Sequence, residues 1–81
     1  MTNANKEKFF ETTDISLVAT ACYFGYQIDG IDKTNPSRAV FYIERGEGFD
    51  ELLQRYWSKT LMVDPLGFFN VLKDTKTRLY Q

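Results

Sequence analysis

The sequence predicts an α+β domain: a three-stranded mixed sheet in the strand order 1-3-2, with three helices packed on it. Two observations carry this prediction. The apolar residues recur with a period of two over residues 38–44 and with a helical period from residue 49 onward, and the glycines at 46 and 48 separate the two patterns. The chain has 81 residues, which suits one small domain with one core.

The N-terminal part predicts an arm and a first strand. Residues 1–7 are polar and have no periodicity, so we expect a disordered arm there. The single domain then spans residues 8–81. Residues 8–12, "KFFET", form a short strand candidate.

A first helix is predicted over residues 14–24. Thr13 or Asp14 can cap its free N–H groups, and Gly25 ends it because glycine adopts the left-handed C-terminal conformation at no steric cost. The apolar stripe of this helix consists of Leu17, Val18, Ala21 and Cys22.

Two further strands and a turn follow. Residues 26–32 alternate in polarity, and Gly30 indicates a bulge or a close approach of backbone. Asn35 and Pro36 favour a turn. Residues 38–44, "RAVFYIE", carry apolar side chains on both faces, as a central strand does.

Two helices complete the chain. The first has an apolar stripe at spacings of three and four, made of Phe49, Leu52, Leu53, Tyr56, Trp57 and Thr60. The second begins at Asp64 and Pro65, because aspartate caps a helix and proline suits its first turn. Its expected inner face is Leu66, Phe69, Leu72 and Leu79, and its expected opposite side is Lys73, Lys76 and Arg78.

The order of elements sets the sheet topology. A helix between the first two strands favours the same direction for both, with the third strand antiparallel to each. The most apolar strand, residues 38–44, belongs in the middle. The predicted sheet order is therefore 1-3-2.

Composition limits the chemistry. The chain has no histidine and one cysteine, Cys22, so neither an intrachain disulfide nor a zinc site with histidine ligands can form. Cys22 lies on the apolar stripe of its helix, so we interpret it as a buried structural thiol. Two carboxylate pairs, Asp29 with Asp32 and Asp50 with Glu51, are better explained as a solvated hairpin and a helix start. We therefore expect no catalytic residues, no metal, no cofactor and no enzymatic activity of the chain on its own.

The charge and hydropathy patterns bear on location and partners. The net charge is −1, whereas nucleic-acid modules are typically basic. No 18-residue apolar run is present and the N-terminus lacks the apolar region of a signal peptide, so we expect a cytoplasmic protein with no membrane contact.

Three groups of residues are candidates for binding. Aromatic and cationic side chains at the end of the second predicted helix are the partner-binding candidates Arg55, Tyr56, Trp57 and Lys59. Three cations of the last helix are the nucleic-acid candidates Lys73, Lys76 and Arg78. The polar hairpin tip contributes Lys33, Asn35 and Arg38, which either bind an anion or simply keep the turn solvated.

Several segments carry a family resemblance. They are "FFETTDISLVATACYFGYQIDGID", "AVFYIE", "FDELLQRYW" and "VDPLGFFNVLKDTKTRLY", which span about residues 9 to 80. The chain resembles a small family, found mostly in bacterial and phage-related genomes, that is catalogued only as a domain of unknown function. Its features fall on Thr12 to Asp14, on Tyr56 and Trp57, and on the Val-x-Pro-x-x-Phe-Phe start of the last helix. The resemblance supports the predicted fold, and because the family has no established activity it implies little about function.

The leading hypothesis is a small interaction module that binds a protein partner, itself included, in a bacterial or phage-infected cell. Near-neutral charge and the 16% aromatic content favour it. Nucleic-acid binding through the last two helices is the alternative.

Overall fold

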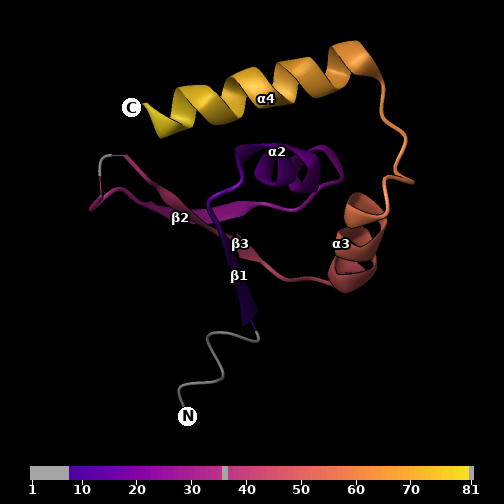
Figure 1. Cartoon of the computed structure of the whole chain (residues 1–81), viewed down its shortest axis with the longest axis horizontal. Helices are drawn as coiled ribbons and strands as arrows, with labels where there is room; N and C mark the ends of the chain where they lie inside the picture. The colour runs from indigo at the N-terminus through magenta and orange to yellow at the C-terminus, as the bar shows by residue number, and fades with distance from the viewer. Residues whose placement is uncertain (1–7, 36, 81) are drawn as a thin grey trace.

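A computed structural model describes residues 8–35 and 37–80 and has the predicted order of elements (Figure 1). The elements are β1 (Phe9–Thr12), α2 (Ile15–Tyr23), β2 (Ile28–Asp32), β3 (Val40–Glu44), α3 (Phe49–Trp57) and α4 (Pro65–Leu79). The expected N-terminal arm, residues 1–7, lies outside the described residues.

The sheet has the predicted order, β1-β3-β2. Both pairings with β3 are antiparallel. β1 and β2 therefore run in the same direction, as expected, but they are not neighbours in the sheet. The sheet was predicted as mixed, and both of its observed pairings are antiparallel. The ladder is irregular between Ile28 and Gly30, where the sequence indicated a bulge.

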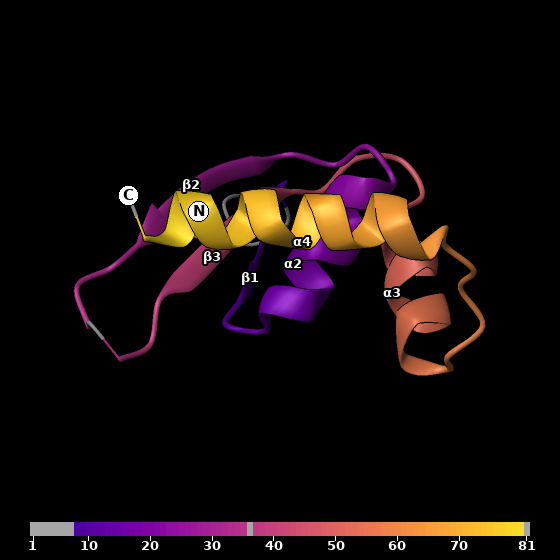
Figure 2. The ribbon, with the colours of Figure 1, turned by 90° about the horizontal axis from the view of Figure 1, so that it is seen from above.

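The three structural layers are the sheet, α2 and α4 (Figures 1 and 2). Helix α2 packs on one face of the sheet, and α4 packs chiefly on the opposite side of α2 rather than on the sheet itself. Helix α3 closes one end of the core, where Phe49 contacts the rings of Phe10 and Tyr26 at centroid distances of 5.4 and 5.1 Å.

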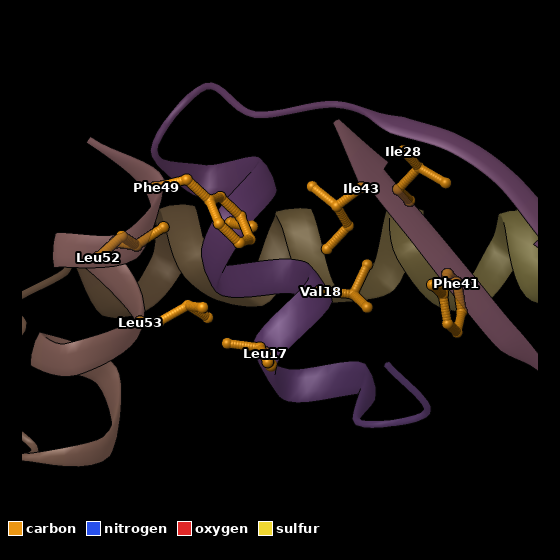
Figure 3. Close-up of a cluster of buried hydrophobic side chains, with 9 residues drawn as sticks. Leu17, Val18, Ile28, Phe41, Ile43, Phe49, Leu52 and Leu53 are labelled. Carbon is orange, nitrogen blue, oxygen red and sulfur yellow. The ribbon is translucent and has the colours of Figure 1, made fainter. Parts of the chain in front are cut away.

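The core lies between α2, α3 and the inner face of the sheet (Figure 3). Phe41 and Ile43 of β3 point into it and are 1% and 0% exposed. The buried cluster consists of Leu17, Val18, Ala21, Ile28, Phe41, Ile43, Phe49, Leu52 and Leu53. The predicted apolar stripe of α2 is thus confirmed at Leu17, Val18 and Ala21.

Local signals set the helix ends as predicted. The Asp14 carboxylate accepts hydrogen bonds from the N–H groups of Ser16 and Leu17, and the Asp64 carboxylate accepts one from Gly67 at 2.7 Å. Gly25 has φ of +100°, a conformation that other residues rarely adopt, and it follows the last turn of α2. The Asp14 and Asp64 carboxylates thus satisfy N–H groups that a helix leaves unpaired at its start.

The inner face of α4 differs from the prediction. Leu66 and Phe69 were expected to face inward, but they are 70% and 60% exposed. The side that faces α2 carries the more buried residues Phe68, Val71, Leu72, Thr75 and Leu79. Leu72 and Leu79 thus lie on the inward side as predicted, whereas Phe68, Val71 and Thr75 take the places expected for Leu66 and Phe69.

Gly67 explains how closely α4 approaches α2. A Cβ at this position would lie 3.4 Å from the Tyr23 ring and 3.2 Å from the Asp64 carboxylate. Tyr23 also accepts a hydrogen bond from the Asp64 N–H at 3.0 Å and contacts the Phe68 ring. A helix-weakening glycine is therefore placed where the two helices meet.

Candidate interaction surface

Exposed large apolar side chains are concentrated in one segment of the chain, from the end of α3 to the first turns of α4. Residues 57–69 hold four of the six exposed large hydrophobic side chains of the described chain. We call these four residues the apolar corner: Trp57, Met62, Leu66 and Phe69. Trp57 is 60% exposed and Met62 is 87% exposed. This concentration of exposed large apolar side chains makes the segment the candidate interaction site of the described chain.

Tyr56 is half-buried and Trp57 is exposed, because adjacent residues on a helix point about 100° apart. The Tyr56 hydroxyl lies 2.6 Å from the Ser16 hydroxyl and donates to the Asp14 carboxylate at 3.1 Å. These bonds tie the end of α3 to the start of α2. Tyr56 therefore has a structural role, and Trp57 is the aromatic residue that α3 presents to solvent.

The same contacts shift two pKa values. Burial acts to raise the pKa of Asp14, but hydrogen bonds from Ser16, Leu17 and Tyr56 outweigh it and hold this pKa below its ordinary value. Burial raises the pKa of the Tyr56 hydroxyl, and the Asp14 carboxylate adds to that rise. At neutral pH the pair is thus an ionised carboxylate held by a protonated phenol.

A shallow, mainly apolar hollow of about 250 Å³ lies beside the corner. It is lined by Thr20, Tyr56, Lys59, Leu61, Val63 and Phe68. Leu61 and Val63 are half-buried, whereas Met62 between them is exposed. Lys59 has φ of +62°, which is uncommon for a residue other than glycine and turns the chain out of α3. The segment after α3 therefore closes the hollow with two side chains and presents the third outward.

The cations predicted for partner binding lie near this junction. Arg55 is exposed and lines a second hollow of about 240 Å³, whose other members include Glu51 and Phe24. Lys59 is exposed and lines the first hollow. Of the four predicted partner-binding residues, Arg55, Trp57 and Lys59 are exposed, whereas the Tyr56 hydroxyl is hydrogen-bonded to residues at the start of α2.

The cations of α4 do not share one side. Residues advance by about 100° around a helix, so Lys73 and Lys76 lie about 60° apart, but Arg78 lies about 140° from Lys73. Arg78 acts electrostatically on Cys22 of α2, which places it toward that helix. The expected group of three cations is thus a pair plus one separate residue.

The pair belongs to a longer stripe on the outside of α4. Leu66 and Phe69 fall within about 80° of Lys73 and Lys76 around the helix. We call these four residues the α4 stripe: Leu66, Phe69, Lys73 and Lys76. All four are exposed, and α4 forms the outermost layer on this side of the molecule (Figure 1).

The hairpin tip is held by its own hydrogen bonds. The side-chain oxygen of Asn35 accepts a hydrogen bond from the N–H of Ser37 at 3.1 Å, and its backbone carbonyl accepts one from the N–H of Arg38 at 3.0 Å. The Lys33 ammonium donates to the carbonyl of Arg78 at 3.4 Å. Hydrogen bonds from Thr34 hold the pKa of Asp32 below its ordinary value. Lys33, Asn35 and Arg38 all remain exposed, but the tip's contacts are those of a turn anchored to α4.

Reactive groups are few among the described residues. Cys22 is half-buried rather than fully buried as predicted, and burial raises the pKa of its thiol while Arg78 acts in the opposite direction. No group of three His, Cys, Asp or Glu side chains in the described part of the chain is placed to hold a metal ion. A hollow of about 440 Å³ lies beside the start of α3, where Arg45 forms an ion pair with Asp50.

The second face of the sheet is a surface that the sequence analysis did not single out. Strand alternation places Phe9, Glu11, Val40, Tyr42, Glu44 and Asp32 on the side away from α2. The three carboxylates are exposed, and Phe9, Val40 and Tyr42 are only half-buried. We call these six residues the open sheet face. The signal was present in the alternation of Val40 and Tyr42 with the buried residues of β3.

Comparisons with known proteins give no match. No protein-family model, no curated protein and no solved structure matches the chain. The resemblance to a bacterial and phage-related family therefore stays a prediction. Over residues 8–35 and 37–80, no helix combines the length and apolar character needed to cross a membrane.

Proposed function

We propose that this chain is a small interaction module that binds a protein partner, itself included, and that it has no enzymatic activity on its own. The observation that carries the proposal is the apolar corner, where Trp57, Met62, Leu66 and Phe69 are each at least 60% exposed. Tryptophan and other aromatic residues are enriched at binding hot spots. Arg55 and Lys59 beside the corner supply charges that can orient a partner.

The proposal includes the cytosol of a bacterium or phage-infected cell as the place of binding. Its support is Cys22, the single cysteine of the chain, which suits a reducing compartment. The module needs no cofactor or metal in this proposal, because its contacts are apolar and ionic.

Site-specific photo-crosslinking tests the proposal. We would place p-benzoylphenylalanine at position 69, in the corner, and separately at position 47, where Glu47 is exposed in the loop before α3. The full chain would be expressed in a bacterial cytosol, irradiated and separated by mass. We expect a discrete protein adduct from position 69 and none from position 47.

The probe at position 47 is the control for non-specific crosslinking. An absence of any adduct from position 69, or the same adducts from both positions, would contradict protein binding through the corner. A further probe at position 62 should give the same adduct as position 69, because Met62 is the most exposed member of the corner.

Nucleic-acid binding remains the alternative, and Lys73 with Lys76 on one side of α4 is the observation in its favour. Two phosphate contacts give a salt slope of only about −2, so binding would be weak at any salt concentration. A titration of labelled single- and double-stranded DNA with the wild type and a K73A/K76A variant tests it. Binding at low salt that the variant loses would support the alternative over the protein partner.

A further inference from the structure

The open sheet face has a defined pattern of acids and apolar groups. The register places Phe9 beside Glu44, Glu11 beside Tyr42, and Val40 beside Asp32. On its other side Tyr42 is opposite Gly30, which has no side chain, so the flank of the ring is uncovered there. The face therefore presents a central aromatic ring with three carboxylates around it.

Two cations lie near these acids: Lys8, and Arg45, which lines a surface hollow with Phe9 and Glu11 but forms an ion pair with Asp50. The Lys8 ammonium lies 5.6 Å from the centre of the Phe9 ring. Asp32 already accepts two hydrogen bonds from Thr34, so Glu11 and Glu44 are the carboxylates for which no hydrogen bond is described. The balance of the face is negative even when Lys8 is counted.

The α4 stripe has the opposite character. Lys73 and Lys76 are its charged members, and its apolar members Leu66 and Phe69 lie toward the N-terminal end. No carboxylate falls within the stripe, because Asp74 points about 100° away from Lys73. This surface is cationic and apolar, and it forms the layer farthest from the sheet (Figure 1).

The two surfaces also agree in size. The stripe from Leu66 to Lys76 rises about 15 Å along α4, and the strand from Val40 to Glu44 extends about 13 Å. Three strands are about 10 Å wide from the first axis to the last, which is the diameter of one helix. One helix can therefore cover the open sheet face.

We propose that the α4 stripe of one copy docks on the open sheet face of a second copy, with Lys73 and Lys76 against Glu11 and Glu44 and with Leu66 or Phe69 against Tyr42. This inference rests on the proposed protein-binding function and names the partner as the chain itself. Charge complementarity between two uncovered surfaces of matching size carries it. It also gives the open sheet face the helix that this face lacks within one copy.

The arrangement has a consequence for assembly. The two surfaces lie on opposite sides of the molecule, so the contact is head-to-tail, and each copy retains one free surface of each kind. Association then does not stop at two copies. A contact of one helix on one small sheet lies at the low end of interface sizes, so we expect affinity in the micromolar range or weaker.

Charge reversal tests the contact. Sedimentation equilibrium at low salt would compare the wild type, a stripe variant K73E/K76E, a sheet variant E11K/E44K and a variant with all four substitutions. All four positions are exposed, and circular dichroism checks that each variant folds. We expect the wild-type average mass to exceed the 9.5 kDa of one chain and to keep rising with concentration.

The variants give the sharp outcome. Each two-site variant should lose association by at least about tenfold, because like charges then face one another. The four-site variant should recover it, because the complementarity is restored with reversed sign. Recovery in the four-site variant confirms the proposal, since a chance loss of folding or solubility would not be repaired.

Other outcomes overturn it. A sheet variant that associates as well as the wild type would show that α4 pairs with α4 or with another surface. A monomeric wild type at all concentrations, with a discrete adduct from position 69, would overturn self-docking and leave protein binding intact. Binding of the wild type to anionic lipid vesicles in place of self-association would assign the stripe to a lipid surface. No association and no adduct would remove both proposals.

Discussion

Helices α2 and α4 pack against each other but differ in how much of their surface they bury. Five consecutive residues of α2, from Leu17 to Ala21, are buried, so this helix is covered on all sides. In α4 only Thr75 reaches the same degree of burial. The difference follows from their layers: α2 lies between the sheet and α4, whereas α4 packs chiefly on α2 and is otherwise outermost (Figure 1).

The composition of each helix matches its layer. Ala19 and Thr20 of α2 are small and buried but lie outside the core cluster, and Thr20 lines a hollow together with Phe68 of α4. A helix that is apolar all round is typical of a buried position. The outer helix has no such demand, and its exposed apolar residues are therefore available for contacts outside the molecule.

The same substitution in the two helices should give the largest contrast. Leu17 is 2% exposed and Leu66 is 70% exposed. We expect Leu17→Ala to lower the free energy of unfolding by about 2–5 kcal/mol, because it leaves a cavity in the core. Leu66→Ala should change it by less than about 0.5 kcal/mol. Urea unfolding followed by circular dichroism measures both, and equal losses would refute the layer assignment.

The two capping aspartates should differ in the same direction. Asp14 holds two backbone N–H groups and the hydroxyls of Ser16 and Tyr56, whereas Asp64 holds the N–H of Gly67. We expect Asp14→Ala to cost about 1–2 kcal/mol and Asp64→Ala about 0.5–1 kcal/mol. Thermal unfolding of both variants ranks them. A larger loss for Asp64→Ala would mean that the contact between α2 and α3 contributes little.

Acid should affect α2 through the same carboxylate. The pKa of Asp14 is lower in the folded chain than the usual value of about 3.9 in an unfolded one. Its contribution is therefore complete above about pH 4 and is lost as the pH falls through the folded-state pKa. Because Asp14 is largely exposed, we expect only a few tenths of a kcal/mol. Unfolding at pH 6 and pH 3 should show a smaller pH effect in Asp14→Asn than in the wild type.

Asp32 gives that experiment its control. Its pKa is also lowered, by hydrogen bonds from Thr34 within the hairpin tip, so Asp14→Asn should retain part of the acid sensitivity. A variant with the same pH dependence as the wild type would show that Asp14 does not titrate in this window.

The smallest effect is expected inside the contact between α2 and α4. Thr75 is 3% exposed, and its hydroxyl donates to the carbonyl of Val71 at 2.9 Å. That bond is internal to α4, and threonine bonds of this kind slightly weaken a helix. Thr75→Val should therefore change the free energy of unfolding by less than about 0.5 kcal/mol in either direction. A loss above 1 kcal/mol would show that the hydroxyl has a role between the helices.

The sequence was sufficient for the order of elements, the sheet order and the helix caps, because these depend on local patterns. Asp14, Gly25 and Pro65 act within a few residues of themselves, and the alternation in β3 is a local property. It was not sufficient for the orientation of α4. Leu66 with Phe69 and Phe68 with Leu72 form two competing apolar stripes, and periodicity alone does not show which one α2 covers.

The candidate site was predicted only in part, because it too depends on contacts between residues that lie far apart in the sequence. The sequence placed both Tyr56 and Trp57 on the apolar stripe of the helix and named both as partner-binding candidates, but it did not show which of them stays exposed. The choice depends on Asp14 and Ser16, which lie about forty residues earlier and bond the Tyr56 hydroxyl. The open sheet face was missed because it exists only where no helix of the chain covers the sheet.

The attachment of α4 chiefly to α2 has a consequence for motion. All of β2, β3 and α3 separate the two helices in the chain, so this contact closes a long loop and is expected to form late in folding. It is also the contact whose loss disturbs least of the core, so α4 should open as a unit while the sheet, α2 and α3 remain folded. In native-state hydrogen exchange, the amides in the middle of α4 should therefore exchange through an opening of lower free energy than those of β3, and α2 should lose its solvent shielding each time.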